Sequence, residues 1–252
     1  MASSQLANSG VGVEAHLVGA AVFFWGSLVF VGRGLLTVDE HHTGRAHVAE
    51  NTNPGSTPTR SALPRGMLLA LGMAGAAAIV IELTAADWAA FRFTDDFATT
   101  ASFGGLGFVA HTSGMMSSRF AGDWVEHRIG SRRLLQLATV LAAAGLLTAT
   151  LIENRWVALA GFFVGGVGAA PFFPRLYDLA AQQPGRPGAG LGALTGGSRI
   201  ATLATPGVIG LLANSSLSVG TAMAIVVGPS LVAFFVVSTR LHQETPEPTP
   251  EV

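Results

Sequence analysis

Cysteine and lysine are both absent from this chain of 252 residues, and charged residues of any kind are few. Without cysteine, the chain has no disulfide or thiolate chemistry. Charged residues make up 12% of it, whereas soluble domains hold about a quarter. Half of the residues are apolar and the mean hydropathy is +0.50, so the composition indicates an integral membrane protein. The net charge of −1 gives no indication of a nucleic-acid partner.

Long apolar runs divide the chain into helices and connections. The polar segment 1–15 lacks the basic start of a secretory signal, and the run 16–36 predicts one transmembrane helix, with an uncleaved signal anchor as the alternative. Segment 37–65 is predicted to be a solvated cytoplasmic linker, and 242–252 a disordered cytoplasmic tail. Between them, 66–241 is predicted to form a six-helix transmembrane bundle, with apolar runs at 66–93, 97–118, 134–152, 156–181, 188–213 and 218–241.

The predicted fold class is all-α, a polytopic membrane helix bundle of about seven transmembrane helices. Backbone groups in lipid must be bonded internally, and runs of this length without alternation exclude a barrel. Arginine-rich loops stay in the cytoplasm. Placing 37–65 inside puts eleven of the fourteen arginines there, with Arg92 and Arg155 outside and Arg199 within the membrane. We therefore expect the N-terminus outside and the C-terminus inside. The all-arginine cations indicate a GC-rich genome, which favours a bacterial plasma membrane.

Residues 119–133 read RFAGDWVEHRIGSRR and are predicted to form a short polar loop on the cytoplasmic side. The pattern G-D-x4-R-x-G-x-R begins at Gly122 and Asp123, continues through Arg128 and Gly130, and ends at Arg132, with Arg133 following. This pattern resembles the cytoplasmic loop motif of major facilitator superfamily transporters. In that superfamily the motif joins the second and third helices of each six-helix half, which is its place after the linker here.

Three further stretches resemble a bacterial branch of this superfamily that is related to sugar permeases. They are ELTAADW at 82–88, GFFVGGVGAAPFFP at 161–174 and TPGVIG at 205–210, which are similar to its seventh, tenth and eleventh helices. The chain therefore resembles the C-terminal half of such a transporter, preceded by one helix. Segment 7–14 faintly resembles the cytoplasmic end of the fourth helix, a location that the arginine count contradicts.

The resemblance implies secondary active transport of a small solute, without a cofactor or an enzymatic activity. Alternating access requires one bundle to move against another. A single half would therefore need a homodimer or a separate N-terminal half. The alternative is a membrane remnant or interaction protein that transports nothing. No metal site is predicted, because His41, His42 and His47 lie in a polar linker without enough fixed ligands.

Ionisable groups inside a membrane usually face a cavity or one another. The candidates are Glu82, Asp87, His111 and Arg199, with Trp88 as an aromatic that could line a cavity. In our hypothesis Arg199 binds an anionic or hydroxyl-rich substrate, and Glu82 or His111 takes up a coupled proton. The alternatives are a structural ion pair between Arg199 and Glu82, or a position of Arg199 nearer to a helix end.

The resemblance also implies that segment 119–133 is a gate. Asp123 would accept hydrogen bonds from the helix that begins near 188–192, where the helix dipole favours a carboxylate. Three loop arginines would pair with acids or with phospholipid headgroups, and Asp178 is a candidate partner. The alternative is a loop that only orients the helices. The predicted gating residues are Arg119, Gly122, Asp123, Arg128, Gly130, Arg132, Arg133 and Asp178.

Overall fold

A computed structural model describes residues 65–183 and 188–244 of the chain. These residues contain no strand and form helices α3 (Arg65–Phe91), α4 (Ala101–Ile129), α5 (Ser131–Leu151), α6 (Arg155–Ala169), α7 (Phe172–Ala181), α8 (Ala189–Ala213) and α9 (Val219–Glu244), with one π-helical turn η3 (Arg92–Asp96) after α3. The predicted segments 1–15 and 16–36, the linker 37–65 up to residue 64, and the tail from residue 245 lie outside the described residues.

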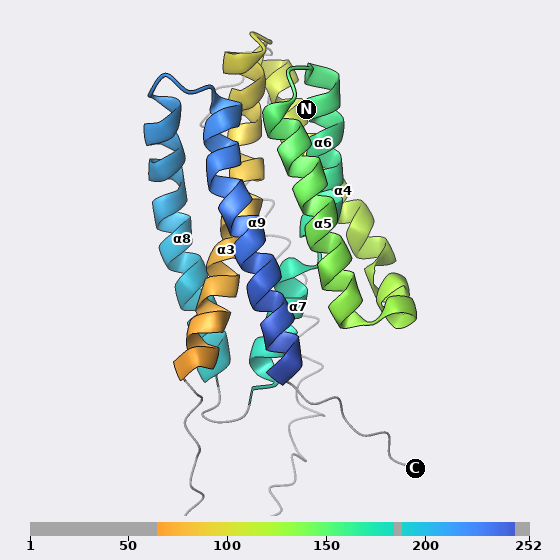
Figure 1. Cartoon of the computed structure of the whole chain (residues 1–252). Helices are drawn as coiled ribbons and strands as arrows, with labels where there is room; N and C mark the ends of the chain where they lie inside the picture. The colour runs from red at the N-terminus through yellow and green to blue at the C-terminus, as the bar shows by residue number, and fades with distance from the viewer. Residues whose placement is uncertain (1–64, 184–187, 245–252) are drawn as a thin grey trace, which may run out of the picture. The chain divides into compact units, whose positions relative to one another are not determined.

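With α3 and η3 taken as one rod and α6 and α7 as another, successive rods run in opposite directions, so the connections collect at two ends of the bundle (Figure 1). One end holds η3 and the turns that follow α5 and α8, and the other holds the start of α3 and the turn between α4 and α5. This alternation agrees with the order of the six predicted runs. The arginine distribution assigns the second end to the cytoplasm, an assignment that remains a prediction.

Four helical segments in the described part are long and apolar enough to cross a membrane: Arg65–Asp96, Ser131–Leu151, Arg155–Ala181 and Val219–Leu241. Helices α4 and α8 have the length, with 29 and 25 residues, but are not among these four segments, and both carry charged or polar side chains along their length, such as His111 on α4 and Arg199 on α8. The prediction of an all-α membrane helix bundle is confirmed. A membrane helix with a polar face must turn that face toward protein or a cavity, which directs attention to α4 and α8.

Glycine lets three pairs of helices approach closely. A Cβ atom on Gly197 of α8 would overlap the carbonyl oxygen of Gly72 on α3, and one on Gly145 of α5 would overlap the backbone of Gly165 on α6. On the same helix α6, a Cβ on Gly166 would overlap the carbonyl oxygen of His111 on α4. These contacts fix α3 to α8 and α6 to both α4 and α5, in the manner expected of small residues at membrane helix interfaces.

Asn154 and Pro171 explain where α6 begins and why α6 and α7 are separate helices. The side chain of Asn154 accepts hydrogen bonds from the backbone N–H groups of Trp156 and Val157 at 3.0 and 3.2 Å, which caps the start of α6. Helix α6 ends at Ala169, and α7 begins after Pro171, whose ring provides no N–H group. The predicted run 156–181 is therefore a broken helix rather than a continuous one.

Candidate functional site

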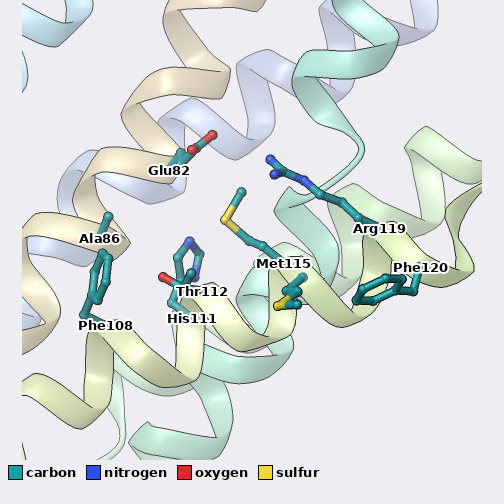
Figure 2. Close-up of a pocket in the computed structure, with 9 residues that line it drawn as sticks. Glu82, Ala86, Phe108, His111, Thr112, Met115, Arg119 and Phe120 are labelled. Carbon is teal, nitrogen blue, oxygen red and sulfur yellow. The ribbon is translucent and has the colours of Figure 1, made fainter. Parts of the chain in front are cut away.

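A cavity of about 660 Å³ lies between α3 and α4. Most of its wall is apolar, but it contains one carboxylate, one guanidinium and one imidazole. Figure 2 shows their side chains converging on the same space from the two helices. The lining residues are Glu82, Ala86, Phe108, His111, Thr112, Met115, Met116, Arg119 and Phe120.

Helical spacing explains why these residues share one wall. On α4 the positions 108, 111, 112, 115, 116 and 119 recur at intervals of three and four, which places them along one face of the helix. On α3 the same interval separates Glu82 from Ala86. The two faces oppose each other, so the cavity is built by two consecutive helices of the chain.

Glu82 and Arg119 are the charged residues of this cavity. The Glu82 carboxylate and the Arg119 guanidinium extend toward the space between the helices (Figure 2), and the arginine charge acts electrostatically on the carboxylate. They do not form one of the close ion pairs present in the described part of the chain. Each charge is therefore left to interact with a third group. Arg119 was predicted as a gating residue, and the structure places it in the wall of this cavity.

His111 lies at the inner wall of the cavity and is 1% exposed. Its Nδ1–H donates a hydrogen bond to the carbonyl oxygen of Phe162 on α6, at 3.3 Å. A carbonyl accepts only, so this bond assigns the proton to Nδ1 and leaves Nε2 as an acceptor. Nε2 has no hydrogen-bond partner among the described residues. An imidazole held in this way can accept one proton or one donor from a bound solute.

The other predicted substrate residues lie outside this cavity. Asp87 is exposed on α3, and Trp88 packs against Phe91 with ring centroids 5.4 Å apart. Arg199 is the eleventh of 25 residues in α8, so its predicted depth near the helix middle is correct. However, Arg199 is exposed while its neighbour Ser198 is buried. The alternative ion pair between Arg199 and Glu82 is not formed in the part of the chain that the structure describes.

Segment 119–133 is not the loop that the sequence predicted. Helix α4 continues through it to Ile129, and α5 begins at Ser131, so Gly130 alone is non-helical. Its backbone has φ 80° and ψ 155°, a region that glycine adopts and other residues avoid. The arginines and Glu126 of this segment have good helix propensity, and they lie beyond the apolar part of the helix. Charge therefore marked the end of the membrane span but not the end of the helix.

Ion pairs at this end connect α4 to α7. Arg175 forms one ion pair with Glu126 and a second with Asp178, the latter at 3.3 Å. Asp178 was a candidate partner for an arginine of segment 119–133, and among the described residues it pairs with Arg175, three residues earlier in its own helix. Arg128 instead lies over the ring of Trp124, 4.0 Å from its centroid. The side chain of Asp123 lies outside what the structure describes, so its contact with the start of α8 stays a prediction.

The opposite end holds a polar cluster that the sequence did not reveal. Arg92 of η3 is 4% exposed and donates to Asp96 at 2.6 Å and to the carbonyl oxygen of Ile152 at 3.1 Å. Asp96 accepts from the backbone N–H groups of Val219 and Gly220 at 3.0 and 2.8 Å, which caps the start of α9. This cluster joins η3, the end of α5 and the start of α9. The i, i+4 spacing of Arg92 and Asp96 was its only signal in the sequence.

Comparisons with known proteins give three relatives. The chain is 28% identical over 176 residues to the membrane protein MosC of Rhizobium meliloti, which covers 69% of the chain and 41% of that protein. It is 28% identical over 158 residues to an uncharacterized MFS-type transporter of Yersinia pestis, covering 62% of the chain and 41% of the relative. It is 31% identical over 121 residues to an uncharacterized transporter of Sinorhizobium fredii, covering 48% of the chain and 32% of the relative.

The length of these matches agrees with the fold. The chain spans less than half the length of each of the three curated relatives. No family model matches the chain. No solved structure matches it either. The names of the relatives, the extent of the matches and the helical membrane bundle confirm the predicted resemblance of this chain to the C-terminal half of a major facilitator superfamily transporter.

Proposed function

We propose that this chain is one half of a secondary transporter and that the cavity between α3 and α4 is part of its solute path. The observation that carries the proposal is a carboxylate and a guanidinium facing the same largely apolar cavity without a close ion pair. Charges of this kind are costly in a membrane unless a solute, an ion or a partner group interacts with them. The names of the relatives support a transport role.

In this proposal the three polar groups have separate tasks. Glu82 takes up the coupled proton, and Arg119 binds an anionic or hydroxyl-rich part of the solute. This role was assigned to Arg199 on the sequence alone, and the geometry favours Arg119 because Arg119 shares the cavity with Glu82. His111 offers Nε2 to a donor on the solute. The exposed rings of Phe108 and Phe120 contribute apolar contact.

The proposal includes a partner for the cavity. Among the residues that the structure describes, those lining it come from α3 and α4, and in this proposal another bundle supplies the opposite wall. A second copy of the chain or a separate N-terminal half would fill this role. The ion pairs that connect Glu126, Arg175 and Asp178 tie α4 to α7 at the cytoplasmic end, and their opening would accompany inward release.

Uptake in living cells tests this function without a known substrate. Bacteria that express the chain would receive an isotope-labelled metabolite extract, and mass spectrometry would compare labelled solutes inside them with those in cells carrying an empty vector. We expect one class of small solute to accumulate, and a protonophore to abolish its accumulation. The mass of the detergent-solubilised protein would show whether two copies associate.

Two variants and two controls separate the roles. Glu82→Gln should lose accumulation against a gradient but retain solute exchange, because only the proton step is removed, whereas Arg119→Gln should lose both. Asp87→Asn on the same helix and Arg155→Gln at the start of α6 keep the cavity intact and should behave like the unaltered chain. Unchanged uptake in Glu82→Gln and Arg119→Gln at equal expression would contradict the proposal.

A further inference from the structure

A second, almost entirely apolar groove of about 460 Å³ lies between α4, α5 and α6. It is separate from the cavity that contains Glu82. Val125 and Ile129 of α4 form one wall, and Leu134, Leu137 and Leu141 of α5 form the other. Phe163 of α6 also lines it. The groove therefore continues along α5 from the Gly130 turn toward the middle of the bundle.

Arginine lies where the groove reaches the end of the helices. Leu141, Leu137 and Arg133 are four residues apart on α5, so Arg133 occupies the same face one turn beyond the apolar lining. Arg132 and Arg133 are both exposed, and neither forms one of the ion pairs found between described residues. The apolar groove thus ends near two cations that have no acidic partner within the described part of the chain.

The dimensions match one leaflet of a bilayer. From Arg133 to Leu141 the helix rises by about 12 Å, at 1.5 Å per residue. Half of a hydrocarbon core is about 15 Å thick. The groove is therefore parallel to the direction of a lipid chain and ends at headgroup level, on the side that the arginine distribution assigns to the cytoplasm.

We propose that this groove binds an anionic phospholipid, with one acyl chain along Leu134, Leu137 and Leu141 and the phosphate group at Arg133. Charge complementarity selects this occupant, because basic pockets between transmembrane helices on the cytoplasmic side bind anionic headgroups. A zwitterionic lipid would fit the apolar wall equally well, but its headgroup has no net negative charge and would be attracted less strongly to the arginine. This site does not depend on transport, since none of its lining residues faces the Glu82 cavity.

Titration of the purified full chain with three ligands tests the proposal. Native mass spectrometry would measure bound phosphatidylglycerol, phosphatidylcholine with the same acyl chains, and glycerol phosphate, which carries the headgroup charge without a chain. We expect phosphatidylglycerol to bind several-fold more tightly than phosphatidylcholine, and glycerol phosphate not to bind. Arg133→Gln should reduce the preference about fivefold, since one arginine near a lipid surface contributes about that factor.

Matched variants distinguish the groove from general surface charge. Arg240→Gln removes an exposed arginine of α9, which does not line the groove, and should leave the preference unchanged. Leu137→Trp fills the groove and should weaken both lipids, with Leu141→Phe as a smaller change if the tryptophan variant does not fold.

Four results would overturn the lipid assignment. Equal binding of the two lipids would show that the headgroup charge does not contribute to binding. Binding of glycerol phosphate would indicate a site for soluble phosphate. An equal loss in Arg240→Gln and Arg133→Gln would show that the arginine acts through net charge alone. A dimer that Leu137→Trp separates would show that a second copy of the chain occupies the groove.

Discussion

The polar cluster around Arg92 should contribute strongly to the stability of the bundle, and Arg92→Met is the change that tests it. Arg92 neutralises Asp96, bonds the last turn of α5 through the carbonyl oxygen of Ile152, and lies over the ring of Phe97 at 4.4 Å. Methionine keeps much of the apolar stem but removes all of the donors. Asp96 would remain, still bonded to the start of α9 but without its cation.

The expected loss follows from the burial of the pair. Removing one partner of a buried ion pair costs about 3–5 kcal/mol, and Asp96 is 12% exposed, so we expect about 2–4 kcal/mol for Arg92→Met. Asp96→Ala should cost more, because it also removes the cap of α9, a contribution of about 0.5–2 kcal/mol. The double variant should lose less than the two single changes together, since no charge is then left unpaired.

Thermal unfolding in detergent, followed by tryptophan fluorescence, measures these changes, because the chain contains four tryptophans. We expect Arg92→Met to lower the midpoint by about 5 °C or more. Arg155→Met is the matched control. Arg155 is exposed near the same end of the bundle, and its aromatic contacts, 5.4 and 5.6 Å from two ring centroids, contribute about 1 kcal/mol or less. Equal midpoints for the Arg92 and Arg155 variants would refute the reasoning.

Two glycine substitutions test the helix contacts by the same thermal measurement. Gly166→Ala should lower the free energy of unfolding by about 2–3 kcal/mol, because its Cβ would overlap the backbone of α4. The control Gly105→Ala meets nothing within 4 Å and should be neutral or stabilising. Similar midpoints for the two variants would contradict the close packing. Gly130→Ala should lower the free energy of unfolding by about 1–3 kcal/mol, because Gly130 has a φ of 80°. Gly122→Ala, inside α4 and unobstructed, should raise it by up to about 1 kcal/mol. A neutral Gly130→Ala would argue against a turn at this residue.

The positions of the helices could be predicted because hydropathy and length report the membrane span directly. The six predicted runs after the linker correspond to α3, α4, α5, the α6–α7 rod, α8 and α9. The ends were less predictable. Hydropathy decreases at Arg119, but the helix continues for another ten residues until Gly130 interrupts the backbone. Hydropathy measures where a chain leaves lipid, whereas backbone conformation determines where a helix ends.

The choice of site residues shows a second limit of sequence reasoning. Arg199 was selected for its depth along a helix, and that depth is correct. Depth does not state which way a side chain faces, and the neighbouring Ser198 rather than Arg199 faces the interior. The spacing of His111, Met115 and Arg119 did indicate that their side chains point the same way, since residues four apart share a face of a helix. Arg119 was assigned to the gating segment 119–133, so its position on this face was not used.

The Arg92 cluster could not be found from neighbouring residues at all. Asp96 bonds Val219 and Gly220, which are more than 120 positions away in the chain. The sequence alone does not predict such a contact, because the free N–H groups at the start of any helix are equally good partners for a carboxylate. The contact can be seen only when the positions of the helices in space are known.

Helix α4 is where the proposed site, the motif and the groove meet. Its middle is held against α6 by Gly114 and Gly166, neither of which leaves room for a Cβ atom. The Glu82 cavity lines this helix from Phe108 to Phe120, and the apolar groove lines it from Ser117 to Ile129, toward Gly130. One polar link at that end runs from Glu126 to Arg175 of α7. The well-packed middle fixes His111, while the less packed end carries Arg119. A solute bound at Arg119 and a lipid bound at Arg133 would therefore act on neighbouring ends of α4 and α5, which Gly130 joins.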